Sequence, residues 1–423
     1  MAKVSEKLAD ALTRHSVYLY RVELGMRNRI NSSLDATIPQ LRAVLTESKA
    51  LESMRQDTAG YIKALESLDG KLARVRGKGF TEAQAASRAD YIDAIAHEVA
   101  YTDDLTKTGL VSPLEKGTRQ ATKDALVMNA VTKTQGENIL AYGEYQGKTI
   151  ARWWKTMQTA DINRIDSVVR KGLADGQTMA KITKSVIGEP KTNYKRGELE
   201  ATRRAAEALA RTTVNGVTNS ARLAYYEQNS DIASSVEYLA TLDSQTSEIC
   251  ASRGGKVYKL GTEPALPAHL YCRSTYVSVI DGLDVTASRP AIKKNLNKEA
   301  QKAWTEKKVA KGMSRTKARK QWGNLSKSYK DKLYYEQYGK YSDSIGTVSG
   351  STTYEKFLRR QPKDFVQDHM GKVKGEMWLT GGKDSTGKKV SLGTFVNNDT
   401  GKPYTIAEIK VREQKLYAKT FND

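Results

Sequence analysis

The chain has 423 residues, enough for two to four domains whose cores need no covalent staples. Its 69 basic residues outnumber 48 acidic ones, and the resulting net charge of +21 favours a polyanionic partner. Two cysteines exclude a disulfide-rich scaffold. No apolar run approaches the roughly 20 residues of a membrane span, and the first residues lack a signal peptide's apolar region. We therefore expect a protein made in the cytoplasm, with no membrane partner.

The first 150 residues predict an elongated, antiparallel array of helices. An apolar face of helical period runs over residues 8–26, and we expect the polar triplet 31–33 to end that helix. Residues 77–79, with two glycines, predict a turn before Thr81 caps the next helix. Further helices are expected over residues 41–56, 59–75 and 81–105. Such an array is typical of a scaffold or an interaction arm.

A second helical block is expected from about residue 145 to 235. Trp153 and Trp154 stand near the start of one helix, where they either anchor the core or form a docking site for a partner protein, because Trp dominates such sites. Arg211 lies in a long helix over residues 198–227. It either faces inward to an acidic or carbonyl partner or is a solvated surface arginine.

The stretch 236–280 is small, rich in turns and chemically distinct. It predicts strands over 236–242, 256–260 and 274–280, and a short helix over 245–252 that Asp243 or Ser244 caps and two glycines end. Both cysteines of the chain lie in this stretch, in the spacing Cys250-x18-His269-x2-Cys272. A compact unit of this kind brings the three side chains together.

Three interpretations of this Cys/His set stay open. The first is a zinc site, since Cys and His are preferred zinc ligands, with Asp243 as a fourth ligand or the site left incomplete. The second is a disulfide that closes a loop of about 22 residues and stabilises by roughly 3 kcal/mol. The third is buried, hydrogen-bonded packing with no cofactor. Without a recognisable oxyanion site, phosphate loop or metal-binding carboxylate set, we expect no enzyme.

The segment 286–345 changes composition. Between Arg289 and Lys340, sixteen basic residues face four acidic ones, with Trp and Tyr interleaved and glycine breaks near 312 and 323. Besides a solvated face, this pattern indicates contact with double-stranded DNA without sequence preference, or with an acidic protein surface. The candidate contacts are Lys293, Lys294, Lys307, Lys308, Arg315, Lys317, Arg319 and Lys320.

Residues 346–423 predict a terminal helical module. We expect helices over 354–360, after a Thr cap, and from Pro362 to His369, which Gly371 ends. A strand is predicted over 390–396, and Thr405 opens a capping box for the last helix. His369 stands without a partner motif and is interpreted as structural.

The order of motifs in the central stretch resembles a known family. Asp243-x2-Thr246-x3-Cys250 is followed by Gly255-Lys-Val-Tyr258 and then by Leu266-Pro-x-His269-x2-Cys272-Arg273-Ser274. This pattern, with Arg211-Thr-Thr upstream, resembles the phage Mu F-like minor head proteins of tailed bacteriophages. Thr246, Arg211 and Arg273 would then belong to the core motif. Downstream, Phe357 departs from the Trp more usual in the family.

The resemblance implies a structural minor head protein of the virion, which joins the procapsid near the portal vertex and touches packaged DNA. Its implied partners are the portal protein and the major capsid or scaffolding protein. Ejection with the genome, a Cys/His-dependent nucleic-acid-processing enzyme and a host binding module are the alternatives. The fold expected is α+β and predominantly α-helical. Its predicted domains are a helical arm (1–150), a Mu F-like core with the β unit (151–285), a basic helical segment (286–345) and a terminal module (346–423).

Overall fold

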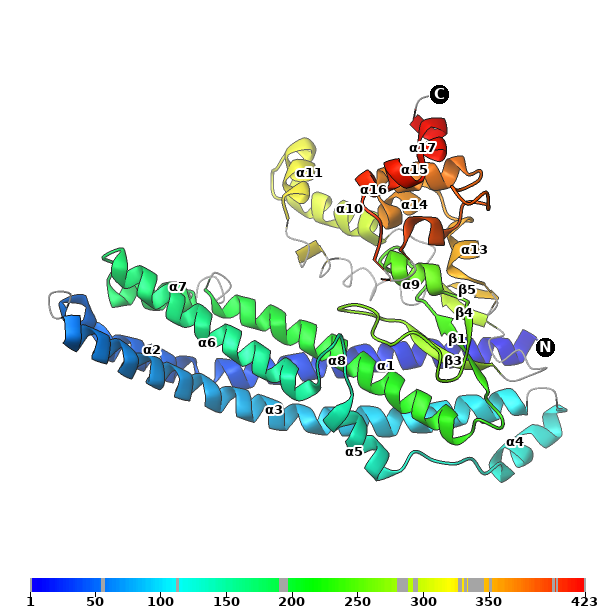
Figure 1. The fold of residues 1–423 in the computed structure, drawn as a ribbon, viewed down its shortest axis with the longest axis horizontal. Coiled ribbons are helices and arrows are strands. Elements are labelled where there is room, and N and C mark those ends of the chain that lie inside the picture. Colours follow the sequence, from blue (N-terminus) through cyan, green and yellow to red (C-terminus); the bar gives the residue numbers. More distant parts are fainter. Residues whose placement is uncertain are drawn as a thin grey trace.

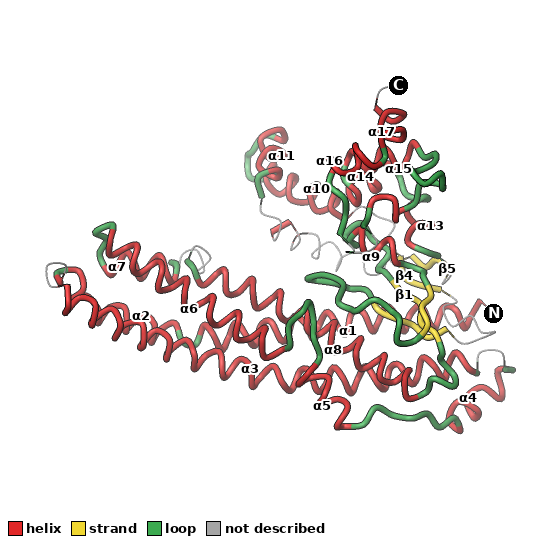
Figure 2. The backbone as a smooth tube through the Cα atoms, in the orientation of Figure 1, coloured by secondary structure: helices red, strands yellow, loops and turns green. Residues whose placement is uncertain are grey.

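The computed structural model describes residues 2–54, 58–111, 114–189, 197–279, 288–291, 296–325, 329–330, 333, 346–349, 352–397, 400 and 402–421. Over these residues the fold is α+β and predominantly helical, as the sequence predicts. A long bundle of helices carries a smaller helical module near one end, and the short strands lie between the two (Figures 1 and 2).

Six helices form the bundle (Figure 1): α1 (Ala2–Asp35), α2 (Ile38–Glu47), α3 (Thr58–Leu110), α6 (Ile150–Ala174), α7 (Met179–Ile187) and α8 (Leu199–Gln228). The 53 residues of α3 make a rod of about 80 Å. A 3-10 turn, η1 (Ser48–Glu52), and the short helices α4 (Lys116–Ala125) and α5 (Lys133–Tyr142) complete this part. Because α3 packs on α1, α2, α6 and α8, it is the central helix that the other long helices of the bundle share as a neighbour.

Two apolar cores lie along the bundle. The core at the far end joins α2 and the first half of α3 to α6 and α7. The middle core joins α1 and the second half of α3 to α6 and α8; it includes Met26, Phe80, Trp154 and Val217. Each core therefore combines residues from the first 150 positions with residues beyond them.

The expected breaks at 31–33 and 77–79 are wrong, because packing keeps both helices continuous. In α1, the buried side chains of Ile30 and Leu34 carry the apolar face past the polar triplet. In α3, Thr81 Oγ1 bonds to the carbonyl of Gly77 inside the helix instead of capping a new one. A Cβ on Gly79 would lie 2.6 Å from Thr37 Cγ2, so this glycine permits close contact with the α1–α2 turn.

Arg76 crosslinks the bundle at this turn. Its side chain and that of Asp161 are both 1% exposed, and Arg76 Nε donates to Asp161 Oδ2 at 2.6 Å. Arg76 Nη1 donates to the carbonyl of Leu34 at 2.9 Å and to Thr37 Oγ1 at 2.7 Å. Thr202 of α8 also donates to the Asp161 carboxylate. One buried arginine thus ties the end of α1 to α3, α6 and α8.

A second buried arginine joins the bundle to the sheet. Arg222 Nε of α8 donates to Glu98 Oε1 at 2.6 Å, and Nη1 donates to the carbonyl of Tyr276 at 2.7 Å. His15 Nε2 lies 2.8 Å from Glu98 Oε2. Burial alone would raise the pKa of Glu98, but the charges of Arg222 and His15 lower it to about 2.

The sheet has the strand order β2-β1-β3, with all pairs antiparallel: β1 (Ser235–Leu239), β2 (Val257–Lys259) and β3 (Thr275–Val279). Val236, in the central strand, pairs with Tyr258 on one side and Ser278 on the other. The helix α9 (Glu248–Arg253) follows β1. The three strands and this helix confirm the sequence prediction, except that Ser247 caps α9 in place of Asp243 or Ser244.

The basic segment and the terminal module lie beyond the sheet. They contain β4 (Ser288–Ala291) paired with β5 (Gly346–Ser349), α10 (Leu296–Val309), α11 (Arg315–Gly323), α13 (Tyr354–Leu358), α14 (Lys363–Met370), α15 (Lys372–Thr380), η5 (Leu392–Phe395), α16 (Ile406–Arg412) and α17 (Gln414–Phe421). Thr353 caps α13 and Thr405 opens a capping box, as predicted. The strand predicted over 390–396 is wrong, because a Ser391–Thr394 capping box folds this segment into the 3-10 turn η5.

Candidate functional site

The Cys/His unit of α9 and the following loop brings three ligand-type side chains together. Cys250 Sγ lies 3.7 Å from Cys272 Sγ and 3.2 Å from His269 Nε2. The ligand atoms of all three residues lie within 4.8 Å of one another, and no other Cys, His, Asp or Glu of the described chain joins this group. Both cysteines are free and buried. We call Cys250, His269 and Cys272 the Cys/His cluster.

The backbone around the cluster explains how three distant positions meet. Ser247 caps α9 by accepting from the amide of Cys250, which fixes this cysteine in the first turn. Tyr271 adopts φ 62, a left-handed conformation that turns the loop so that Cys272 follows His269 closely. The amide of Tyr271 donates to Thr212 Oγ1 of α8 at 3.4 Å. The bundle therefore holds this loop against α9.

Polar neighbours orient the cluster. His269 Nδ1 lies 2.7 Å from the carbonyl of Leu270, so this nitrogen carries the proton and Nε2 faces the sulfur of Cys250. Ser247 Oγ lies 2.7 Å from the same Nε2. The hydroxyl of Tyr238 in β1 donates to Cys250 Sγ at 3.1 Å.

The cluster favours a thiolate at one sulfur. A hydrogen bond from Cys272, together with His269, holds the pKa of Cys250 well below its usual value although burial opposes this. The hydrogen bond to Cys250 and burial raise the pKa of Cys272 well above its usual value. Burial would lower the pKa of His269, but the hydrogen bond and charge of Cys250 raise it. Of the two thiols, Cys250 is therefore the one that ionises at the lower pH.

Asp243, which the sequence offered as a fourth ligand, lies outside the Cys/His cluster. Its carboxylate accepts from Arg273 Nη1 at 2.6 Å and Nη2 at 2.9 Å, and from Thr246 Oγ1 at 3.2 Å. Burial would raise the pKa of Asp243, but Arg273 lowers it. Asp243, Thr246 and the partly buried Arg273 therefore form a hydrogen-bonded group beside the cluster, which joins the turn after β1 to the start of β3.

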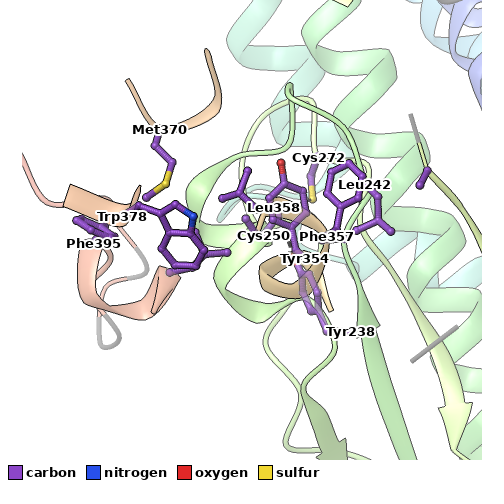
Figure 3. Packing of buried hydrophobic residues seen from close by; sticks show 14 of the residues in the cluster. Tyr238, Leu242, Cys250, Cys272, Tyr354, Phe357, Leu358, Met370, Trp378 and Phe395 are labelled. Carbon is purple, nitrogen blue, oxygen red and sulfur yellow. Dashed lines mark hydrogen bonds between the residues drawn. The ribbon is translucent and has the colours of Figure 1, made fainter. Parts of the chain in front are cut away.

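The terminal module packs on this group and on the two cysteines; Figure 3 shows Tyr354, Phe357 and Leu358 beside Cys250 and Cys272. The hydroxyl of Tyr354 in α13 donates to the carbonyl of Asp243 at 2.6 Å and lies 3.2 Å from His369 Nδ1. Lys374 Nζ donates to both carboxylate oxygens of Glu248, at 2.9 and 2.8 Å. Cys250 and Cys272 share one apolar core with Phe357, Trp378 and Phe395. Sequence reasoning missed these contacts, since the motif gives no sign of a partner over a hundred residues away.

Arg211 faces the loop of the Cys/His cluster from α8. Its guanidinium carbon lies 4.8 Å from the centre of the Tyr271 ring, and Nε lies 3.7 Å from Glu23 Oε2 of α1. Burial raises the pKa of Glu23 to about 7, although Arg211 opposes the shift. The arginine thus links α1, α8 and the loop.

The two tryptophans have different environments. Trp154 is 3% exposed in the middle core, so its indole is not available to a partner. Trp153 is half-buried; its Nε1 donates to the carbonyl of Tyr145 at 2.8 Å and Lys148 Nζ lies 4.9 Å from the ring centre. Of the two indoles, Trp153 is therefore the one that a partner could reach.

Helices α10 and α11 pack on each other as a hairpin, with the Trp304 and Trp322 rings 5.8 Å apart. Trp304 is buried, so it serves the hairpin's own packing. The exposed side chains include those of Lys307, Arg315, Lys317, Arg319 and Lys320, and Lys308 lies partly buried over Trp304. Lys293 and Lys294 lie outside the described residues.

A match to a known family covers the elements that build this site. The family model described as Phage Mu protein F like protein matches residues 163–277, from α6 through β3. This segment is similar to the phage Mu F-like head morphogenesis proteins. The match covers the stretch that contains the central motifs and confirms their resemblance to that family.

Neither a curated protein nor a solved structure matches the chain significantly. None of the described helices is long and apolar enough to cross a bilayer.

Proposed function

We propose that this protein is a structural minor head protein of a tailed phage virion, which enters the procapsid near the portal vertex and contacts packaged DNA. The observation that carries the proposal is the family match over residues 163–277, which includes every member of the Cys/His cluster. The portal protein and the major capsid or scaffolding protein are its proposed partners. The protein acts by binding and not by catalysis.

The α10–α11 hairpin is the proposed DNA surface. Its described part, residues 296–325, has nine basic residues and two acidic ones, Glu299 and Glu306. The basic side chains of α11 are exposed, and no base-reading motif accompanies them. Affinity of this kind comes from phosphate contacts and is independent of sequence.

A matched pair of variants tests this surface. The first variant replaces four exposed residues of the hairpin with glutamine: Arg315, Lys317, Arg319 and Lys320. The control replaces four exposed lysines of η1 and α3: Lys49, Lys63, Lys71 and Lys78. Both remove four positive charges, so an effect of net charge alone is equal in the two.

Binding to random duplex DNA is then measured over a range of salt. Each phosphate contact contributes about 0.9 to the magnitude of the slope of log K against log salt concentration. The slope of the hairpin variant should therefore be smaller in magnitude by up to about 3.6. The control should keep the slope of the unmodified protein. Equal slopes for all three proteins would exclude the hairpin as the DNA surface and favour its docking onto an acidic protein.

The position in the virion is tested by cryo-electron microscopy of virions and procapsids without imposed symmetry. The expected result is density for the long bundle beside the portal ring. Normal heads from a phage lacking this gene, or density confined to the capsid shell away from the portal, would contradict the proposal.

A further inference from the structure

We propose that Cys250, His269 and Cys272 bind one zinc ion, which crosslinks α9 to the loop before β3. This site goes beyond the proposed function, because a head protein can assemble with or without a metal. The ligand types are those that zinc prefers, and three of them converge where α9 meets the loop before β3.

The spacing of the sulfur atoms fits zinc. Two thiolates bound at about 2.3 Å to one tetrahedral ion lie about 3.8 Å apart, and Cys250 Sγ and Cys272 Sγ are 3.7 Å apart. A thiolate and an imidazole nitrogen on the same ion lie about 3.5 Å apart, near the 3.2 Å between Cys250 Sγ and His269 Nε2. The ligand atoms of all three residues lie within 4.8 Å of one another, so Cys272 and His269 need to approach by at most about 1.3 Å to reach this geometry.

The neighbours of His269 fit a metal ligand as well. A ligating histidine usually donates its other N–H to a backbone carbonyl or carboxylate, which fixes the tautomer. His269 makes this contact from Nδ1 to Leu270, so Nε2 carries the lone pair for the ion, which would replace the Ser247 hydroxyl 2.7 Å away. The Tyr238 hydroxyl then supports the Cys250 thiolate from the opposite element, β1.

Charge balance favours a divalent cation here. Two thiolates and one neutral imidazole carry a charge of −2, and a zinc ion makes the site neutral. A neutral site is favourable here because Cys250 and Cys272 are only 2% and 1% exposed, and a buried net charge is costly. Asp243 is already bound by Arg273, so we assign the fourth position to a solvent molecule.

The test uses the full chain, without a metal-binding tag, purified under reducing conditions. Elemental analysis should find about one zinc ion per chain, and cobalt exchanged into the site should show thiolate-to-cobalt absorption of an intensity typical of two thiolates. Removing the ion with a chelator should lower the melting temperature, and added zinc should restore it. The cobalt spectrum requires no variant, so it decides the question even if substitutions unfold the protein.

Variants assign the ligands. Cys250→Ser, Cys272→Ser and His269→Ala should each lose the zinc, whereas Ser252→Ala, on the same helix but bonded to Ile249, should keep it. Asp243→Asn should also keep it. Loss of zinc from a folded Asp243→Asn variant would overturn the ligand set.

Two results for the unmodified protein would overturn the site altogether. One is a metal content below about a tenth of an ion per chain together with no cobalt absorption. The other is a Cys250–Cys272 disulfide, detected as a mass lower by two hydrogen atoms, in protein kept under reducing conditions.

Discussion

Replacing Arg76 with methionine should destabilise the bundle by about 3–5 kcal/mol, because it leaves a buried carboxylate without its cation. Asp161 is 1% exposed, and in the variant its described partner would be the Thr202 hydroxyl. The carbonyl of Leu34 and the hydroxyl of Thr37 would also lose a donor. Urea unfolding, followed by the helical signal in circular dichroism, measures the loss.

The double variant Arg76→Met/Asp161→Leu removes both charges and should recover most of that stability, since apolar replacement of a buried pair is often neutral. As a control, Arg170→Met breaks pairs with Asp166 and Asp69, and the three side chains are 46%, 34% and 35% exposed. Each of these exposed pairs should contribute less than about 1 kcal/mol. If the double variant is no more stable than Arg76→Met alone, the charge argument is refuted, and Arg76 acts through packing and its bonds to α1.

Further predictions concern single positions. Folding lowers the pKa of Glu98 from 4.5 to about 2, so the ionised carboxylate contributes about 3 kcal/mol to the free energy of unfolding above pH 4.5. This contribution is lost as the pH falls toward 2. The urea midpoint should therefore fall over this range, and it should fall less in Glu98→Gln. The pH dependence from Glu23 has the opposite sign. Because its pKa is raised to about 7, the protein loses stability as the pH rises from 4.5 through 7 and the buried carboxyl ionises. Glu23→Gln should therefore raise the melting temperature at pH 8 but not at pH 4. Gly70→Ala, with nothing within 4 Å of its Cβ, should stabilise α3 by up to about 1 kcal/mol, whereas Gly79→Ala should destabilise it; equal melting temperatures would contradict the packing argument.

The sequence predicts local structure well where the signal is local. Alternation over 236–242, the Thr caps at 353 and 405 and the glycine at 371 each act within a few residues, and the corresponding elements are present. The break predicted at residues 77–79 fails for the opposite reason. Glycine weakens a helix by about 1 kcal/mol, and burial of the neighbouring apolar and ionic side chains outweighs that cost.

The sequence likewise predicts one part of the candidate site and not the other. The spacing of Cys250, His269 and Cys272 identifies a set of ligand types that the structure brings together. The sequence has no means of deciding whether Asp243 faces that set or Arg273, because both lie within the same motif. The strands β4 and β5 were also missed: each has four residues, and Pro290 lies in one of them.

The hydroxyl of Tyr354 donates to the carbonyl of Asp243, so this contact forms only after the chain has been synthesised beyond residue 354. The core around Cys250 continues to Leu416, so one side of the cluster stays open until the last helices leave the ribosome. At about 5–20 residues per second, the interval between Cys250 and Leu416 is on the order of ten to thirty seconds. During that time the terminal module does not yet cover the two thiols, so they are accessible to solvent and reagents. A chain truncated before α13 would therefore leave this pair permanently accessible, and an alkylating reagent would distinguish it from the finished protein.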